Sequence, residues 1–105
     1  MALIVQKYGG TSVGSPERIK NVAKRVAKSR AAGHDVVVVV SAMSGETNRL
    51  VALAHEMQEF PDPRELDVVL ATGEQVTIGL LAMALKDIGV DAKSYTGWQV
   101  AVKTD

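Results

Sequence analysis

The chain has 105 residues, enough for one small domain, and 47% of them are hydrophobic, enough for a globular core. Its 12 basic and 12 acidic residues cancel, so the charge balance predicts neither nucleic acid nor a membrane surface as a partner. The lack of cysteine excludes disulfides and thiolate metal sites and predicts a cytoplasmic location. We expect no leader before Leu3, and the apolar run at residues 76–85 is too short to span a bilayer.

The first predicted strand, Leu3–Tyr8, leads into a loop that combines a cation with glycines. Residues 7–13 read Lys-Tyr-Gly-Gly-Thr-Ser-Val. Lys7 therefore lies at the end of a buried strand, and Gly9 and Gly10 follow it. A backbone without side chains can fold around an anion there, beside the lysine, and we predict that this anion is phosphate. The loop is neither a P-loop nor a dinucleotide fingerprint, because its lysine precedes the glycines. The alternative is that the glycines serve only a turn.

A helix is predicted from Ser15, an N-cap followed by proline, to Gly33. Five valines follow at residues 36–40. An unbroken apolar run cannot alternate between core and water, so we expect this strand to be covered on both faces, as in a parallel sheet between helix layers. The strand, helix and second strand form a right-handed βαβ unit whose strands end at the same edge of the sheet.

The loop after the second strand is predicted to face the same crevice as Gly9 and Gly10. Residues 41–45 read Ser-Ala-Met-Ser-Gly, and a helix is predicted to begin at Thr47. The free N–H groups at the start of a helix favour an anion. The alternative is that Ser44 or Thr47 merely caps the helix.

The next segment is predicted to hold a linker and two helical stretches. Residues 60–63 are the linker, residues 64–72 resume a helical pattern, and Thr-Gly-Glu at residues 72–74 is predicted to interrupt it. The helix at residues 75–88 is apolar nearly all round, so we expect more protein to enclose it than one sheet face supplies. Glu74 then stands at a helix start, where a carboxylate is commonly only a dipole partner.

Two short strands are predicted at residues 90–95 and 98–102, with a turn at residues 96–97. No helix follows to cover the last strand, and no adenine pocket is evident. We therefore expect residues 1–105 to leave apolar surface and an open sheet edge exposed, which favours a homo-oligomer or association with a missing part of the chain.

Four segments, taken together and in order, resemble the aspartokinases of the amino acid kinase superfamily. They are residues 7–13, residues 41–48 (Ser-Ala-Met-Ser-Gly-Glu-Thr-Asn), residues 72–75 (Thr-Gly-Glu-Gln) and residues 95–99 (Tyr-Thr-Gly-Trp-Gln). The resemblance implies an α/β fold, a three-layer sandwich with a mainly parallel sheet between helices. It covers only the N-terminal, amino-acid-binding part of such a domain, without the nucleotide-binding half or the regulatory ACT domains.

The resemblance implies an ATP-dependent kinase that phosphorylates the side-chain carboxylate of L-aspartate. The product, 4-phospho-L-aspartate, begins lysine, threonine and methionine biosynthesis. Such a reaction needs positioning and charge stabilisation and no covalent nucleophile. The alternatives are a related kinase acting on glutamate or acetylglutamate, or a non-catalytic anion-binding and association fragment. We expect the 105-residue chain alone to be inactive.

The resemblance also implies the site residues. Lys7 is expected to be catalytic and to neutralise charge on the transferred phosphoryl group, and Glu74 to hold the ammonium group of aspartate. Mg²⁺ is expected with ATP, but no protein ligand for it is evident, and His34 and His55 lack metal-ligand spacing. The full set comprises Lys7, Tyr8, Gly9 and Gly10 for ATP and Ser41, Thr47 and Glu74 for aspartate.

Overall fold

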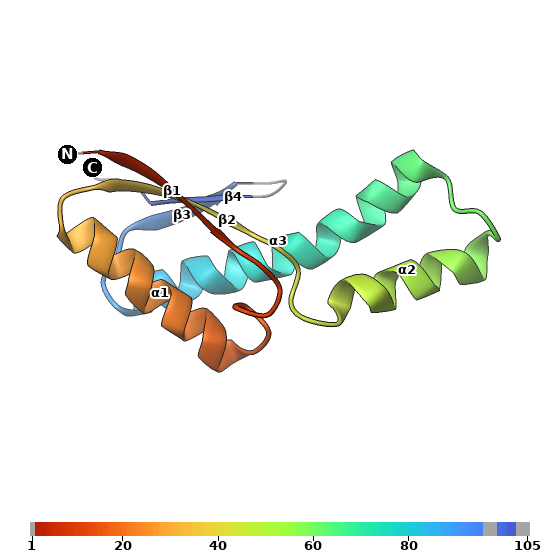
Figure 1. Ribbon diagram of the computed structural model, residues 1–105, viewed down its shortest axis with the longest axis horizontal. Helices are drawn as coiled ribbons and strands as arrows, with labels where there is room; N and C mark the ends of the chain where they lie inside the picture. Colours follow the sequence, from red (N-terminus) through yellow and green to blue (C-terminus); the bar gives the residue numbers. More distant parts are fainter. Residues whose placement is uncertain (1, 96–98, 103–105) are drawn as a thin grey trace.

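The computed structural model describes residues 2–95 and 99–102 and is an α/β fold, with helices under one face of a sheet and a helical hairpin that extends beyond the ends of the strands (Figure 1). The predicted turn at residues 96–97 and the predicted strand start at Trp98 lie outside the described residues. The elements are β1 (Leu3–Tyr8), α1 (Pro16–Ala31), β2 (Asp35–Val40), α2 (Glu46–Met57), α3 (Pro63–Asp87), β3 (Ala92–Tyr95) and β4 (Gln99–Val102).

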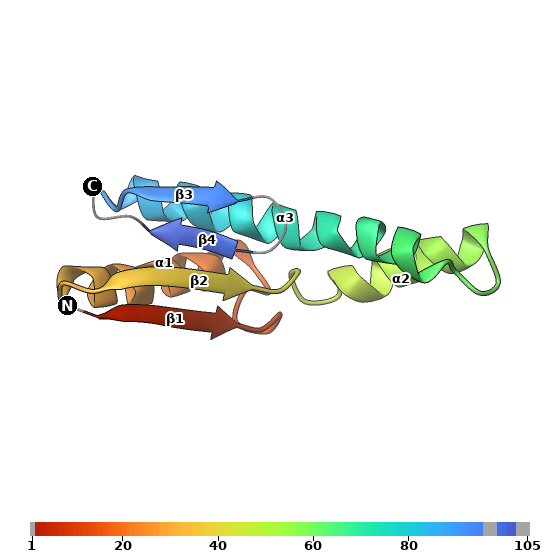
Figure 2. The ribbon, with the colours of Figure 1, turned by 90° about the horizontal axis from the view of Figure 1, so that it is seen from above.

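The sheet has the strand order β1-β2-β4-β3 (Figure 2). β1 and β2 are parallel, with Leu3 opposite Asp35 and Tyr8 opposite Val40. β4 runs antiparallel to both β2 and β3. The α1 crossover makes the first pair parallel, whereas β3 and β4 are too close in sequence for a crossover and pair as a hairpin. The mainly parallel sheet implied by the resemblance is thus represented here by the β1–β2 pair.

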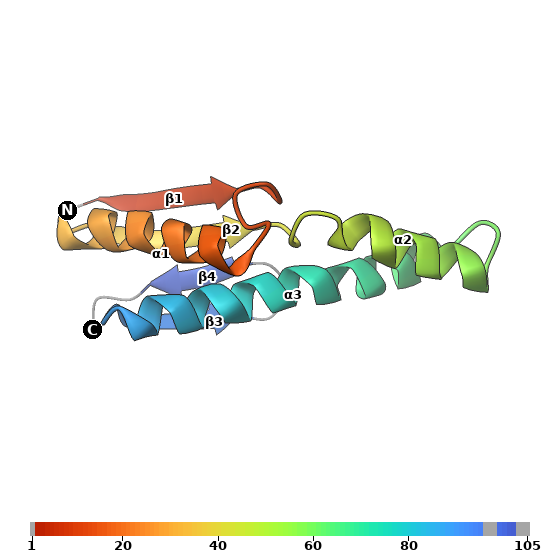
Figure 3. The same ribbon diagram turned by 90° about the horizontal axis from the view of Figure 1, so that it is seen from below.

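α1 confirms its predicted boundaries. The Ser15 hydroxyl accepts a hydrogen bond from the Arg18 N–H at 3.3 Å, and Pro16 occupies the first turn. At the other end Gly33 has a φ of 92°, which glycine adopts without strain. α1 lies beside α3 under the sheet (Figure 3). The residues that α1 buries against the core are Ile19, Val22, Ala23 and Val26.

The valine run at residues 36–40 is covered on one face only by the described part of the chain. Its even-numbered valines are at most 2% exposed and pack in the core beneath the sheet with α1 and α3. The odd-numbered valines are half-buried on the opposite face. Leu3 and Val5 of β1 share that opposite face and are 68% and 64% exposed. The expected second helix layer is therefore not supplied by these residues, and we call this surface the open sheet face.

α3 is one continuous helix, so the predicted interruption at residues 72–74 is wrong. A glycine inside a helix costs roughly 1 kcal/mol relative to alanine, which is why the sequence indicated a break. A Cβ atom at Gly73 would lie 3.0 Å from the Ala42 Cβ and 3.3 Å from Leu50 Cδ1. Close packing of α3 against the segment after β2 therefore accounts for the glycine.

The described residues enclose only one side of the apolar C-terminal half of α3, which leaves the exposed apolar surface that was expected for this part of the chain. Ile78 and Leu81 are at most 2% exposed, whereas Val76 and Met83 are 53% and 68% exposed. With its full 25 residues, α3 is long and apolar enough to cross a membrane, although the run at residues 76–85 alone is not. Core helices meet the same test, and α3 packs along α1, α2 and the sheet, so we assign it to the core of the fold.

Candidate functional site

The loops after β1 and β2 lie against each other at one edge of the sheet, as predicted. The Ser41 N–H donates to the Tyr8 carbonyl oxygen at 3.1 Å, and the Ser41 hydroxyl donates to the same oxygen at 3.3 Å. A Cβ atom at Gly10 would lie only 3.1 Å from the Ala42 carbonyl oxygen. A side chain at residue 10 would therefore push the two loops apart.

The first loop is closed by its own backbone. The N–H groups of Ser12, Val13 and Gly14 donate to the carbonyl oxygens of Gly9, Gly10 and Thr11 at 3.0, 3.3 and 3.4 Å. The N–H groups of Gly10 and Thr11 have no backbone acceptor within the described ranges. At Gly9 an added Cβ would meet no atom within 4 Å, so packing does not explain the glycine there. Neither Gly9 nor Gly10 has a positive φ, so the conformation of a turn does not require glycine at either position, and the turn-only alternative gains no support.

Lys7 is exposed on the open sheet face. Its neighbours Gln6 and Tyr8 point to the α1 side, because the Tyr8 hydroxyl donates to Gln6 Oε1 at 2.7 Å and Gln6 Nε2 donates to Ser29 Oγ at 2.8 Å. Burial raises the pKa of Tyr8, and the nearby Arg25 opposes this more weakly, so the phenol stays protonated at neutral pH. Strand alternation therefore places the Lys7 ammonium on the face opposite α1.

The start of α2 carries no side-chain cap. Gly45 is the N-cap residue, with a φ of 83° and no capping hydrogen bond from a side chain. The alternative that Ser44 or Thr47 merely caps this helix is therefore wrong. Thr47 is exposed in the first turn, while Ser41 is half-buried and bonded to the end of β1. The Thr47 hydroxyl is thus not occupied by helix capping.

Glu46, in the first turn of α2, was not among the predicted site residues. Its carboxylate accepts hydrogen bonds from Arg49, including one from Arg49 Nε at 3.2 Å. These bonds, more than the charge of the guanidinium, lower the pKa of Glu46. The sequence could have indicated this pair, because an acidic residue followed three positions later by a basic one forms an ion pair on a helix. The pair leaves this helix start without a net side-chain charge.

Glu74 lies inside α3, so the dipole-partner alternative, which requires a helix start, is wrong. The residue is half-buried and follows Gly73, at which an added Cβ would lie 3.4 Å from Glu46 Cγ as well as close to Ala42. The middle of α3 is thereby held against the second loop and the first turn of α2. α3 lies on the α1 side of the sheet, whereas Lys7 lies on the open sheet face (Figure 3).

The predicted side chains at this edge are not engaged with one another. In the described part of the chain, ion pairs join only Glu46 to Arg49 and Arg64 to Glu65, so neither Lys7 nor Glu74 is neutralised by a partner. Among the same residues no three His, Cys, Asp or Glu side chains form a group that could hold a metal ion. The edge therefore offers a cation, a carboxylate, hydroxyls and backbone N–H groups for a small charged molecule.

Comparison with known proteins gives consistent matches. The family model described as the amino acid kinase family matches residues 2–104. The chain is 69% identical to an aspartokinase of Pseudomonas aeruginosa and 58% identical to aspartokinase 2 of Bacillus subtilis, and it spans 26% of the length of each. A crystal structure of aspartate kinase from Synechocystis superposes with a TM-score of 0.84 at 52% identity, covering 87% of this chain and 16% of that one.

Proposed function

Because this chain belongs to the amino acid kinase family, we propose that it is the amino-acid-binding part of an ATP-dependent aspartate kinase. The reaction transfers the γ-phosphoryl group of ATP to a side-chain carboxylate oxygen of L-aspartate and forms 4-phospho-L-aspartate. In metabolism this is the first step towards lysine, threonine and methionine. The names of the similar proteins support this substrate over glutamate or acetylglutamate.

One structural observation carries the proposal: glycine contacts bring the assigned segments to a single sheet edge. Gly10 allows the first loop to reach the second, and Gly73 allows α3 to reach the second loop and α2. Segments more than 60 residues apart in the sequence thus meet where parallel strands end, the usual place for ligands in α/β sheets.

Lys7 and the first loop act on the phosphoryl group in this proposal. The transition state of phosphoryl transfer spreads charge over the transferred oxygens, and catalysis is largely positioning and charge stabilisation. The Lys7 ammonium offsets that charge, and the N–H groups of Gly9 and Gly10 donate to phosphate oxygens. The Tyr8 hydroxyl is bonded to Gln6 and its carbonyl oxygen accepts from Ser41, so Tyr8 contributes to ATP binding by positioning the start of the first loop.

The second loop, α2 and α3 hold the amino acid. The Thr47 hydroxyl donates to a carboxylate of aspartate, helped by the N–H groups in the first turn of α2. The Ser41 hydroxyl does the same by exchanging its 3.3 Å bond to the Tyr8 carbonyl oxygen for one to the substrate. The Glu74 carboxylate accepts from the ammonium group. Because Glu74 has no ion-pair partner in the described residues, its charge is available to the substrate.

Mg²⁺ enters this proposal with the ATP phosphates, where it neutralises charge. No residue of the chain is assigned to it, because the described residues offer no group of metal ligands. The steps assigned to Lys7, Ser41, Thr47 and Glu74 do not depend on where the ion is held.

We propose that residues 1–105 are inactive on their own. The chain spans 26% of its aspartokinase relatives, and its open sheet face and the exposed side of α3 favour association, either with itself or with a nucleotide-binding half. The lack of cysteine supports a cytoplasmic location, and the balanced charge supports an enzyme without nucleic acid or membrane partners.

The test measures ADP release by the complete enzyme with aspartate, glutamate or acetylglutamate as acceptor. The proposal expects turnover with aspartate and little with the other two. Preferred use of glutamate or acetylglutamate would assign the chain to a related acid kinase. In a parallel assay, ADP release by residues 1–105 alone would contradict the proposed inactivity of the chain.

A further inference from the structure

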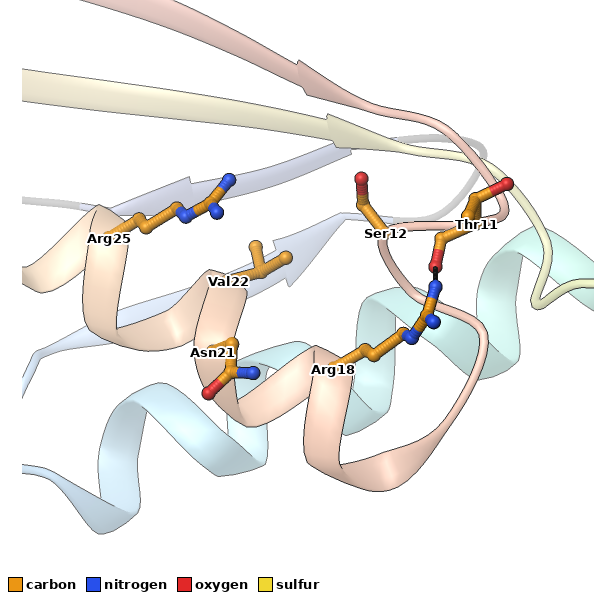
Figure 4. A pocket seen from close by; sticks show the side chains of 6 residues that line it. All are labelled: Thr11, Ser12, Arg18, Asn21, Val22 and Arg25. Atoms are coloured by element: carbon orange, nitrogen blue, oxygen red, sulfur yellow. Dashed lines mark hydrogen bonds between the residues drawn. The ribbon is translucent and has the colours of Figure 1, made fainter.

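A separate surface cavity of about 220 Å³, open to solvent, lies between the first loop and α1, and the two arginines that line it are exposed. It opens on the side of β1 to which Gln6 and Tyr8 point, whereas Lys7 lies on the open sheet face. Figure 4 shows two arginines reaching from α1 towards the loop, with Val22 between them. The lining residues are Thr11, Ser12, Arg18, Asn21, Val22 and Arg25.

Helix geometry and one hydrogen bond position the two arginines. Arg18 and Arg25 are seven residues apart, which is about two turns and therefore the same side of the helix. Val22 between them is 2% exposed. Arg18 Nη1 donates to the Thr11 carbonyl oxygen at 2.7 Å, which ties this guanidinium to the loop and leaves its other N–H groups for a guest (Figure 4).

The cavity carries uncompensated positive charge. Its lining holds two guanidinium groups and no carboxylate. Neither arginine forms an ion pair within the ranges that the structure describes. The hydroxyls of Thr11 and Ser12 and the amide of Asn21 add neutral polar groups around the same space. Such a lining is unfavourable for a cation and favourable for a compact anion.

We propose that this cavity binds a small phosphate-bearing molecule, at a site distinct from the sheet edge assigned to aspartate and ATP. Guanidinium groups present paired donors that match the oxygens of a phosphate. The volume admits a phosphate group with a small body, but it is below the range of about 300–1,000 Å³ that drug-sized ligands occupy.

A ligand bound in this cavity would contact the first loop on the side that faces α1, away from the second loop. Thr11 and Ser12 line the cavity, while Gly10 of the same loop lies against the second loop. A phosphate held by Arg18 and Arg25 therefore restrains the segment that carries the proposed phosphoryl site. The inference rests on the cavity's own residues and does not require the proposed function.

The experiment titrates inorganic phosphate into the complete protein by calorimetry, in a Lys7→Ala background that weakens the sheet-edge site. Arg25→Gln and Arg18→Gln are each expected to lower the phosphate association constant about tenfold or more, as loss of a charge-assisted pair does. Lys24→Gln is the matched control, because it removes one exposed positive charge from the same helix outside the cavity. It is expected to change the constant less than about twofold.

Three results would overturn the inference. They are no phosphate binding by the Lys7→Ala protein at millimolar concentrations, equal losses in Lys24→Gln and Arg25→Gln, or full affinity in Arg25→Gln. Arg18→Gln also removes a bond to the loop, so Arg25→Lys serves as a second variant that keeps the charge and loses only the planar fork. An intermediate loss in Arg25→Lys supports phosphate recognition by the guanidinium. Kinase activity is a separate readout, so failure of either proposal is recognisable without the other.

Discussion

The two loops at the sheet edge are held in place by different means. The first loop is closed by three hydrogen bonds of its own backbone and by Arg18, all from nearby in the sequence. The second loop is held from a distance, through the close approach of Gly73 in α3. The comparison teaches that the phosphoryl side of the proposed site is built locally, whereas the amino-acid side depends on tertiary packing.

The largest expected effect is on turnover, and it comes from a substitution on the phosphoryl side of the proposed site alone. In the complete enzyme, Lys7→Ala should lower turnover by on the order of 10² to 10³, because it removes one preorganised positive group from the transferred phosphoryl. The Michaelis constant for aspartate should change little. Steady-state kinetics with both substrates checks this, and Lys7→Arg should rescue only in part. Near-normal turnover of Lys7→Ala would return this lysine to the solvated surface.

The packing of the second loop is tested at Gly73, with Gly79 of the same helix as control. An added Cβ at Gly73 meets neighbours at 3.0 to 3.4 Å, whereas at Gly79 it meets nothing within 4 Å. Gly79→Ala should therefore stabilise the helix by about 0.5–1 kcal/mol. Gly73→Ala gains the same propensity but overpacks the contact, at a cost of about 1–3 kcal/mol.

Denaturant unfolding of the two variants measures this difference. A net destabilisation by Gly73→Ala of up to about 2 kcal/mol is expected after the helix gain is subtracted. Equal stabilisation by both substitutions would show that the second loop does not depend on the close approach of α3.

Much of the local structure could be predicted from the sequence. The bounds of β1 and α1 and the meeting of the two loops follow from an apolar run, a Ser-Pro helix start and βαβ geometry, each of which is local or general. The helix break at residues 72–74 was wrong, because helix propensity opposes Gly73 while a contact from a distant segment requires it. The valine run indicated two buried faces, but the described residues cover only one.

The sequence indicated some residues of the candidate site but not the structural setting of others. The glycines and hydroxyls of the loops were found from their position after strands. The setting of Glu74 was misjudged with the helix break, since the residue lies within α3 and not at a helix start. Arg18 and Arg25 were not among the predicted site residues, because nothing in the pattern of a single helix shows that a loop folds back over it.

Glu74→Gln tests the amino-acid side of the proposed site. The substitution keeps the shape of a residue inside α3 and removes the charge proposed to hold the substrate ammonium. The Michaelis constant for aspartate should rise at least about tenfold, near 1.4 kcal/mol, while that for ATP stays nearly unchanged. Thermal unfolding is the control and should shift little. A large loss of stability with unaltered aspartate saturation would make Glu74 a packing residue.

The smallest expected effect concerns Glu46 and pH. Its bonds to Arg49 lower the pKa of the carboxyl in the folded state below the ordinary value of 4.5. A lowered folded pKa gives stability that is present above the unfolded pKa and is lost as pH falls through the folded one. Glu46→Gln should therefore slightly lower the melting temperature at pH 7. The gap from the parent protein should close below pH 4.5, and a gap independent of pH would show that the ion pair contributes nothing.

The unbroken α3 has a mechanical consequence. Its 25 residues form a rod of about 37 Å that runs from the tip of the helical hairpin with α2, past the sheet edge, to β3 (Figure 2). We expect α3 to move as one rigid body, so that a displacement of the hairpin tip also displaces the middle of the helix beside the sheet edge. Spin labels at Arg64 and Lys86 should keep one separation with and without substrate, and two separations would reveal a joint within the rod.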